Sequence, residues 1–305
     1  MIKTMLTLLT STTLMQAQLS PYDIRPDDLK SDRYMKIKIL DAKELSFKFG
    51  SNISELSALA YSKNRLYALS DNGELYHFDL KFKNDKIKSL VLTDRFMLKN
   101  KKNKPLKKQK RDSEGLALVD DTLLISFEKK SRVELYTLEG VKIEKKKIHK
   151  SLRDLKSYAR GNKGLEAVTY SKKYGIITAP EIPLKGEKKS LHTLYAKQKT
   201  WKFKASGSLT DMTFIDKNNL LVLERKFDKH ILRWLITISR VSLQNCDSSR
   251  VCKQEVLASL DNTYDWKIDN FEGLTKISKN KFLMVSDDND MFFQNTLLVY
   301  FEILD

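Results

Sequence analysis

Glycine and proline are scarce in this sequence, with 10 and 5 residues among 305. This scarcity excludes collagen-like and linker-rich chains. Two cysteines and four widely separated histidines provide no ligand set with the spacing of a zinc site. No apolar run reaches the roughly 20 residues that a membrane-spanning helix needs. The chain instead contains many short β-forming runs, with 41% hydrophobic and 31% charged residues, which is enough for a packed core.

Positive charge is in large excess, with a formal net charge of +17. Much of it lies in two lysine-rich runs, residues 99–111 and 142–150. Such runs are typical of solvated loops and strand edges, or of surfaces that attract anions such as phosphorylated substrates and lipid headgroups. Nucleic acid is not an expected partner, because the basic runs lack the interleaved aromatic residues on which bases stack.

The N-terminus has the features of a secretory signal peptide over residues 1–17. Lys3 gives a positive start, an apolar stretch follows, and Ala17 is a small residue suited to cleavage. We therefore expect an exported protein, periplasmic or extracellular and monomeric, with an N-terminal extension at 18–33 and one domain at 34–305. In an oxidising compartment Cys246 and Cys252 are expected to form a disulfide, with two free thiols as the alternative.

One phrase occurs five times: an acidic residue, a short apolar strand, a polar turn, and a second apolar strand that ends near another acid. Successive copies are 45 to 61 residues apart, which is the length of a propeller blade. Further strand-like runs lie between the copies. The copies are ELSALAYSKNRLYALSDNG (55–73), DSEGLALVDDTLLISFEKK (112–130), KGLEAVTYSKKYGIITAPE (163–181), LTDMTFIDKNNLLVLERKF (209–227) and FEGLTKISKNKFLMVSDDN (271–289).

These patterns predict an all-β fold, a single β-propeller with four-stranded blades. Five copies indicate five blades, although the long connections at 84–111 and 228–260 leave a sixth blade open. A pair of stacked β-sandwiches is the alternative fold. We expect residues 34–47 to complete the last blade beside residues 296–304, which would leave no open edge. One short helix is expected at 148–159.

Alignment of the copies produces two columns of mostly acidic residues, 14 or 15 positions apart in every copy. Two antiparallel strands and a turn bring the chain back to its starting level, so both columns should meet at one mouth of the central channel. Column one holds Ser57, Glu114, Glu166, Asp211 and Glu272. Column two holds Asp71, Glu128, Glu181, Arg225 and Asp287, with Glu224 one position from its column.

So many carboxylates at one mouth would repel each other unless a cation compensated them. Calcium accepts several oxygen ligands and is the cation that such a set favours. The alternative is structural, because an acid at a strand entry can bond to backbone amides of a neighbouring blade. The expected metal ligands are Glu55, Asp71, Asp112, Glu114, Glu166, Glu181, Asp211, Glu272 and Asp287, with Asn72, Asp288 and Asn289 as further candidates.

The phrases DSEGLAL (112–118), NKGLEAVTY (162–170), DMTFIDKNNLLVLERKF (211–227) and NFEGLTKI with VSDDN (270–289) resemble the phytase-like propeller family, described as esterase-like activity of phytase. The resemblance covers residues 50–303 and implies an exported propeller, calcium-dependent, that hydrolyses phosphoesters or carboxyl esters. Ser57 and Arg225 interrupt the acidic columns, so the five blades should not contribute equally.

Two functions are therefore expected. The first is a metal-dependent hydrolase of anionic esters, with Glu114, Glu166 and Glu272 as ligands or base and Arg225 holding the substrate anion. No G-x-S-x-G phrase is present, which disfavours a serine esterase. The second is a non-enzymatic exported propeller that binds a protein partner or an anionic envelope surface through its basic loops.

Overall fold

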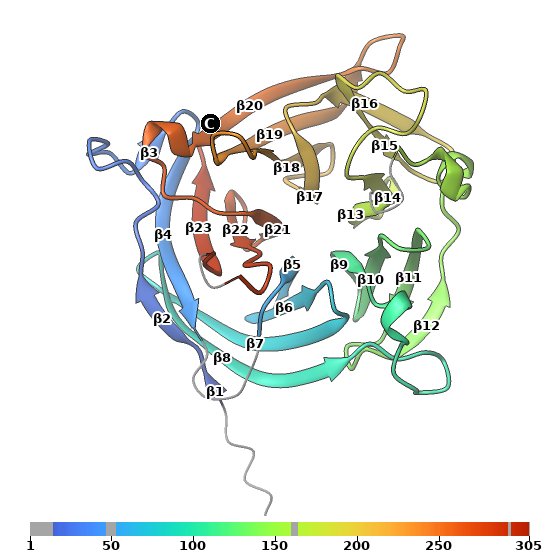
Figure 1. Cartoon of the computed structure of the whole chain (residues 1–305), viewed down its shortest axis with the longest axis horizontal. Coiled ribbons are helices and arrows are strands. Elements are labelled where there is room, and N and C mark those ends of the chain that lie inside the picture. Colours follow the sequence, from blue (N-terminus) through green and yellow to red (C-terminus); the bar gives the residue numbers. More distant parts are fainter. Residues whose placement is uncertain (1–14, 47–52, 160–163, 292–293, 305) are drawn as a thin grey trace, which may run out of the picture.

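The computed structural model describes residues 15–46, 53–159, 164–291 and 294–304, so most of the predicted signal peptide lies outside the described residues. Five antiparallel sheets stand around a central axis, each with its first strand innermost (Figure 1). The inner strand of each sheet contacts the inner strand of the next, and that of the fifth contacts that of the first. The chain is thus a five-bladed β-propeller, which confirms the predicted fold and number of blades.

Each of the first four blades is built from four consecutive strands, while the fifth takes its outermost strand from the N-terminal part of the chain. Blade 1 contains β5 (Leu56–Ser62), β6 (Arg65–Ser70), β7 (Glu74–Lys83) and β8 (Lys86–Met97), and blade 2 contains β9 (Ser113–Val119), β10 (Thr122–Phe127), β11 (Arg132–Tyr136) and β12 (Lys142–Lys145). Blade 3 contains β13 (Leu165–Ser171), β14 (Gly175–Pro180), β15 (Leu191–Tyr195) and β16 (Thr200–Lys204), and blade 4 contains β17 (Ser208–Phe214), β18 (Asn219–Asp228), β19 (Arg233–Cys246) and β20 (Cys252–Asp261). Blade 5 contains β21 (Phe271–Lys276), β22 (Lys281–Ser286), β23 (Leu297–Ile303) and β4 (Ile37–Ser46).

The core is divided among the five interfaces between neighbouring blades. In β18, Leu221 and Leu223 pack toward blade 5, whereas Leu220 and Val222 pack toward blade 3. Successive side chains of a strand point to opposite faces of its sheet, so a sheet that is covered on both faces needs apolar residues without alternation. This explains why the inner halves of the blades have uninterrupted apolar runs.

The ring is closed by pairing of the two ends of the chain. β23 pairs with β22 on one side and with β4 on the other, with Leu297 opposite Glu44 and Ile303 opposite Ile37. Two shorter segments extend this closure: β1 (Met15–Gln16) pairs with β8 of blade 1, and β2 (Gln18–Pro21) pairs with β4 of blade 5. Ala17 lies between them and is buried. The predicted fourth strand of the last blade is confirmed.

Two details differ from the sequence-based expectations. The connections considered for a sixth blade instead contain β8 and the long β19–β20 pair. The short helix expected at 148–159 is wrong, because two separate 3₁₀ turns form there, Lys150–Leu152 and Leu155–Ser157. Asp154 accepts a hydrogen bond from the Lys156 amide and so starts the second turn instead of continuing the first. Within the described residues, no helix is long and apolar enough to cross a bilayer.

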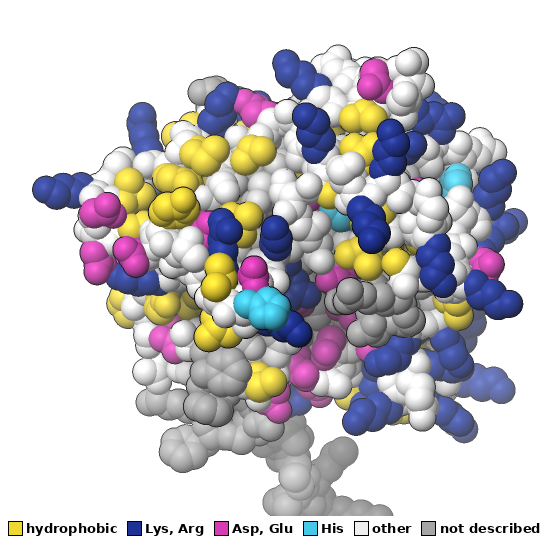
Figure 2. Space-filling model, turned by 45° about the horizontal axis from the view of Figure 1, so that its top comes forward, with side chains coloured by type: hydrophobic (Ala, Val, Ile, Leu, Met, Phe, Trp, Pro, Cys, Tyr) yellow, Lys and Arg dark blue, Asp and Glu magenta, His cyan; other side chains and the backbone are white. Residues whose placement is uncertain are grey.

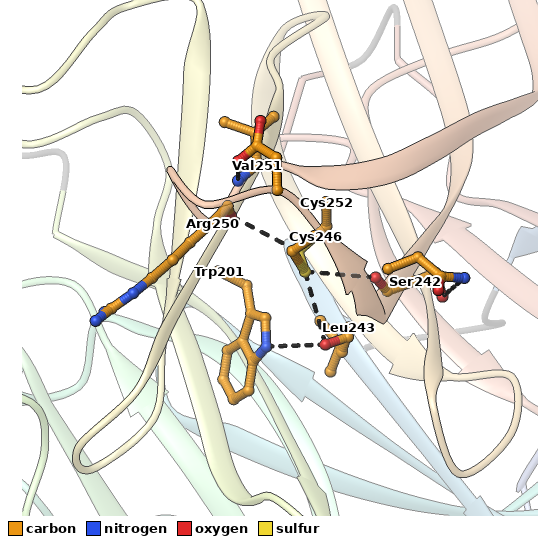
Figure 3. Close-up of a disulfide and its surroundings, with 9 residues drawn as sticks. Trp201, Ser242, Leu243, Cys246, Arg250, Val251 and Cys252 are labelled. Carbon is orange, nitrogen blue, oxygen red and sulfur yellow. Dashed lines mark hydrogen bonds between the residues drawn. A yellow bond between two sulfur atoms is a disulfide. The ribbon is translucent and has the colours of Figure 1, made fainter.

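A disulfide joins Cys246 and Cys252 at the outer end of the β19–β20 pair (Figure 3). Nearby, the Trp201 indole donates a hydrogen bond to the Leu243 carbonyl over 3.1 Å, which ties blade 3 to blade 4. The disulfide therefore joins two neighbouring outer strands of one blade and lies away from the inner strands.

Candidate functional site

A β-bulge near the start of every inner strand positions the first column. In four blades the ladder skips one residue, since Leu56 pairs with Ser70 and Ala58 with Leu69 while Ser57 is left over. The blade 3 ladder has the same irregularity between Leu165 and Val168. A bulge turns one side chain out of the regular alternation. The residues at the bulge are Ser57, Glu114, Glu166, Thr210 and Glu272.

The structure corrects the first column in blade 4, where the bulged residue is Thr210 and not Asp211. Asp211 is buried, and its carboxylate accepts hydrogen bonds from its own neighbour Met212 N (2.8 Å) and from Leu274 N (2.7 Å) of blade 5. It corresponds to Gly115 of blade 2, where an added Cβ would lie 2.8 Å from Val168 N. Asp211 therefore bonds to backbone amides between blades.

The second column starts where each second strand ends. In blades 1, 2, 3 and 5, the backbone amide of the second-column residue donates a hydrogen bond to the carbonyl of the residue two positions before the bulge. Examples are Glu128 N to Asp112 O (3.0 Å) and Asp287 N to Asn270 O (2.9 Å). This hydrogen bond holds the first-column and second-column residues of a blade at the same level of the channel mouth. In blade 3 the residue two positions before the bulge is Gly164. Glycine is required there, because a Cβ would lie 2.2 Å from the Glu128 carbonyl oxygen. The equivalent bonds in blades 1 and 3 are Asp71 N to Glu55 O and Glu181 N to Gly164 O.

Blades 2 and 3 bring the carboxylates into two groups that share Glu128. Asp112, Glu114 and Glu128 offer oxygens that all lie within 4.8 Å of one another, and so do Glu128, Glu166 and Glu181. Figure 2 shows acidic side chains gathered in the central part of one face, with Lys and Arg side chains around them. A single cation could bind to ligands from both blades there.

Arg225 is a largely buried cation among the carboxylates of blades 3 to 5. Its guanidinium lies 2.9 Å from a Glu272 oxygen and 3.8 Å from a Glu181 oxygen, and it donates a hydrogen bond to the Asn270 amide oxygen. The Asn270 amide nitrogen in turn donates to Glu272 (3.0 Å) and Asp287 (3.5 Å). Burial would lower the pKa of Arg225, but the surrounding carboxylates, Glu272 first, raise it. Arg225 therefore compensates the blade 4–5 side of the mouth.

The carboxylates on the other side are not neutralised to the same extent. Burial, followed by the charges of neighbouring acids, raises the pKa of Glu114 and of Glu166 well above the usual value. The same causes raise the pKa of Asp71 to about 7. On the blade 5 side, burial and then Glu272 raise the pKa of Asp287 to about 8, even though Arg225 is near it. Among the residues that the structure describes, one buried oxygen of Asp71 has no hydrogen-bond partner. Negative charge in the mouth is thus costly without a further cation.

Two predicted ligands have partners of their own at the edge of the mouth. Asp112 forms a 2.8 Å ion pair with the Lys129 ammonium group and accepts the Lys129 amide. Glu55 accepts a hydrogen bond from the Asn72 side chain, and burial, then Asp290 and Asp288, raises its pKa. Neither residue is as poorly compensated as Glu114 or Glu166.

The Glu224 side chain lies on the opposite face of β18 from Arg225, outside the mouth. Its carboxylate is fully buried, accepts the amides of Ser206 (2.7 Å) and Gly207 (3.2 Å), and lies 3.4 Å from the His192 ring. Adjacent residues of a strand face opposite sides. Arg225 therefore occupies the second column in blade 4, and Glu224 supports the connection between blades 3 and 4.

Sequence reasoning missed two members of the mouth. Glu128 was placed in the second column but not among the ligands, although it belongs to both carboxylate groups. The two columns do not include Asn270, yet it links Arg225, Glu272 and Asp287. Its position two residues before the bulge is also that of Glu55 and Asp112. An alignment extended by two residues would have identified Asn270 as part of the site.

The family described as phytase-like, esterase-like activity of phytase, matches residues 51–290, and the chain belongs to it. No curated protein sequence matches the chain. Among solved structures, glutaminyl cyclase from Myxococcus xanthus is 8% identical with a TM-score of 0.46, covering 88% of this chain and 97% of that one. The PQQ-bound aldose sugar dehydrogenase from Streptomyces coelicolor is 8% identical with a TM-score of 0.46, covering 88% and 98%. Similarity at this level carries no information about function.

Proposed function

We propose that this protein is a calcium-dependent hydrolase of phosphoesters or related anionic esters, exported to the periplasm or the cell exterior, with its site at the channel mouth. The observation that carries the proposal is the pair of carboxylate groups that share Glu128. The donors are all oxygens, which suits a hard cation. Asp71, whose pKa is raised by burial and then by nearby acids that include Asp112, adds a buried oxygen that has no hydrogen-bond partner among the described residues. The apolar leader and the disulfide support export.

Glu114, Glu128, Glu166 and Glu181 would hold the calcium ion, with Asp112 and Asp71 at its edge. When bound, calcium polarises an ester oxygen and lowers the pKa of water. Arg225 would hold the substrate anion, and its contacts with Glu272 and Asn270 fix its orientation. Asp287, whose pKa is raised to about 8 by burial and then by Glu272, can hold or release a proton near neutral pH.

The test combines a binding measurement with a turnover measurement. Calcium should raise the melting temperature of the wild-type protein relative to chelator, because it binds only the folded state. Glu128→Gln and Glu166→Gln should each remove most of that rise, whereas Asp121→Asn, in an exposed turn, should not. Hydrolysis should be sought with phosphomonoester, phytate, lactone and aryl-ester substrates. An unchanged calcium shift in both Gln variants would rule out the proposed ligands, and no turnover on any substrate would overturn the enzymatic function.

A second candidate is a non-enzymatic propeller that binds an anionic envelope surface. It is favoured by the loop between β8 and β9, which exposes Lys101, Lys102, Lys104, Lys107, Lys108 and Lys110. This loop is on the mouth face, because Leu98 N bonds to the Gly73 carbonyl just beyond Asp71. Replacement of these lysines by glutamine should abolish salt-sensitive binding to vesicles with anionic lipid. Binding that persists in this variant would contradict the second candidate.

A further inference from the structure

A large cavity opens beside the acidic mouth, between blades 3 and 4. Its volume is about 1080 Å³, just above the roughly 300–1,000 Å³ that is usual for small-molecule sites. One side is the connection from β14 to β15, and the other is the β18–β19 hairpin. Glu181 and Arg225 line this cavity and also belong to the mouth. A ligand in the cavity would therefore reach the carboxylate groups directly.

One wall of the cavity is aromatic. Phe227 and Trp234 are opposite each other in the β18–β19 ladder, with ring centroids 4.3 Å apart. Phe227 is 46% exposed, which is unusual for a residue of its size. The apolar lining also includes Ile182, Pro183 and Leu184 of the β14–β15 connection. A flat apolar group between these walls would cover surface that is now open to water.

The rim of the cavity is basic. Lys185, Lys189 and Lys226 are all exposed, and none has a carboxylate partner in the described part of the chain. The carboxylate of Glu187, which also lines the cavity, already accepts hydrogen bonds from the Tyr195 hydroxyl (2.6 Å) and the Leu184 amide (3.1 Å). The ammonium groups are thus available to an anionic ligand.

We propose that this cavity binds anions that carry an aromatic ring, with the ring against Phe227 and Trp234 and the anionic group between the rim lysines and Arg225. The inference deepens the proposed function, on which it rests for catalysis: the substrates would be aryl esters of phosphate, and the cavity would hold the aryl group while the ester points to the mouth. Binding to the cavity itself needs no calcium ligand.

The test measures binding apart from turnover. Phenyl phosphate, methyl phosphate and phenol are titrated in chelator by calorimetry, and the fluorescence of Trp234 is followed in parallel; Trp201 and Trp266 are both buried. Phenyl phosphate should bind about tenfold or more tightly than methyl phosphate, as one buried ring contact allows. Phe227→Ser and Trp234→Leu should each abolish this preference for phenyl phosphate. The Lys185→Gln, Lys226→Gln double variant should bind both phenyl phosphate and methyl phosphate more weakly.

Lys217→Gln is the matched charge control, because Lys217 is an exposed lysine in the turn between β17 and β18. This variant should bind each ligand with unchanged affinity. Circular dichroism and melting temperature show that each variant is folded, and two independent aromatic variants guard against misfolding of one. Equal affinity for phenyl and methyl phosphate would overturn the cavity proposal, even if calcium-dependent hydrolysis is found. Tight binding of phenyl phosphate without its hydrolysis in calcium would leave the binding site standing and overturn the assignment of aryl phosphates as substrates.

Discussion

Glu166 and Asp211 occupy similar surroundings in the sequence, but their carboxylates have different partners. Glu166 is at a bulge and lies near Glu128 and Glu181, whereas Asp211 is one residue past a bulge and bonds to two backbone amides. The spacing between acids could not reveal this difference, because a bulge shifts the side chains by one position without changing the apolar pattern. Asp211 thus bonds to backbone amides within the same motif that supplies the candidate ligands, and we expect its role to be structural.

We expect Asp211→Ala to destabilise the protein while leaving calcium binding intact. The Leu274 amide would lose its acceptor in a buried place, which costs about 1–3 kcal/mol. Urea unfolding in chelator should show a lower midpoint with an unchanged slope, and calcium should still raise stability. Asp121→Asn is the control for loss of an acid. A loss of the calcium response in Asp211→Ala, with the fold retained, would instead make Asp211 a ligand.

At the scale of elements, closure of the ring depends on β4. This strand is far from β23 in sequence, and without it β23 would expose an open edge in the last blade. β2 covers β4 in turn, with Gln18 opposite Ser46. The N-terminal part of the chain therefore contributes to the domain core. Of the described residues, cleavage after Ala17 would remove β1 and Ala17 and leave β2 and β4 in place.

Removal of residues 1–17 should leave a folded monomer, and removal of residues 1–46 should not. The longer deletion uncovers β23 and removes Ile37, Ile39 and Ala42 from the interface with blade 4. A synthetic peptide of residues 33–46, added in trans, should restore the fold by strand addition. Circular dichroism and size-exclusion chromatography measure both effects, with a scrambled peptide as control. A stable, monomeric 47–305 fragment would contradict this role of β4.

The blades and their closure could be predicted from sequence because they depend on apolar runs and turns that are repeated five times. The acid columns could be predicted only to within one residue. In blade 4 the bulge falls at Thr210, one residue before the expected Asp211, whereas Arg225 lies in the second column as the alignment predicts. The Arg225–Asn270–Glu272 contacts cross from blade 4 to blade 5 and depend on packing that no spacing encodes. The cavity likewise arises from two connections that are distant in sequence.

At the scale of the whole molecule, the mouth should make the metal-free protein less stable as the pH rises. The carboxyls of Asp71 and Asp287 have pKa values raised from 3.8 to about 7 and about 8 by burial and then by neighbouring acids. In the unfolded chain they lose their protons near pH 4, so above that pH the folded state binds more protons. Stability therefore falls as the pH rises through these values, by up to about 1.4 kcal/mol per pH unit for each proton.

The measurement that isolates this effect is urea unfolding in chelator between pH 7 and 8.5. Burial lowers the pKa of His77 and of His149, which acts in the opposite direction at lower pH, so that range is avoided. The Asp71→Asn, Asp287→Asn double variant resembles the protonated mouth and should have a flatter dependence on pH. Saturating calcium should flatten the dependence of the wild type in the same way, because it replaces the protons as the compensating charge. Identical slopes for the wild type and the double variant in chelator would show that these two carboxyls do not control the stability of the mouth.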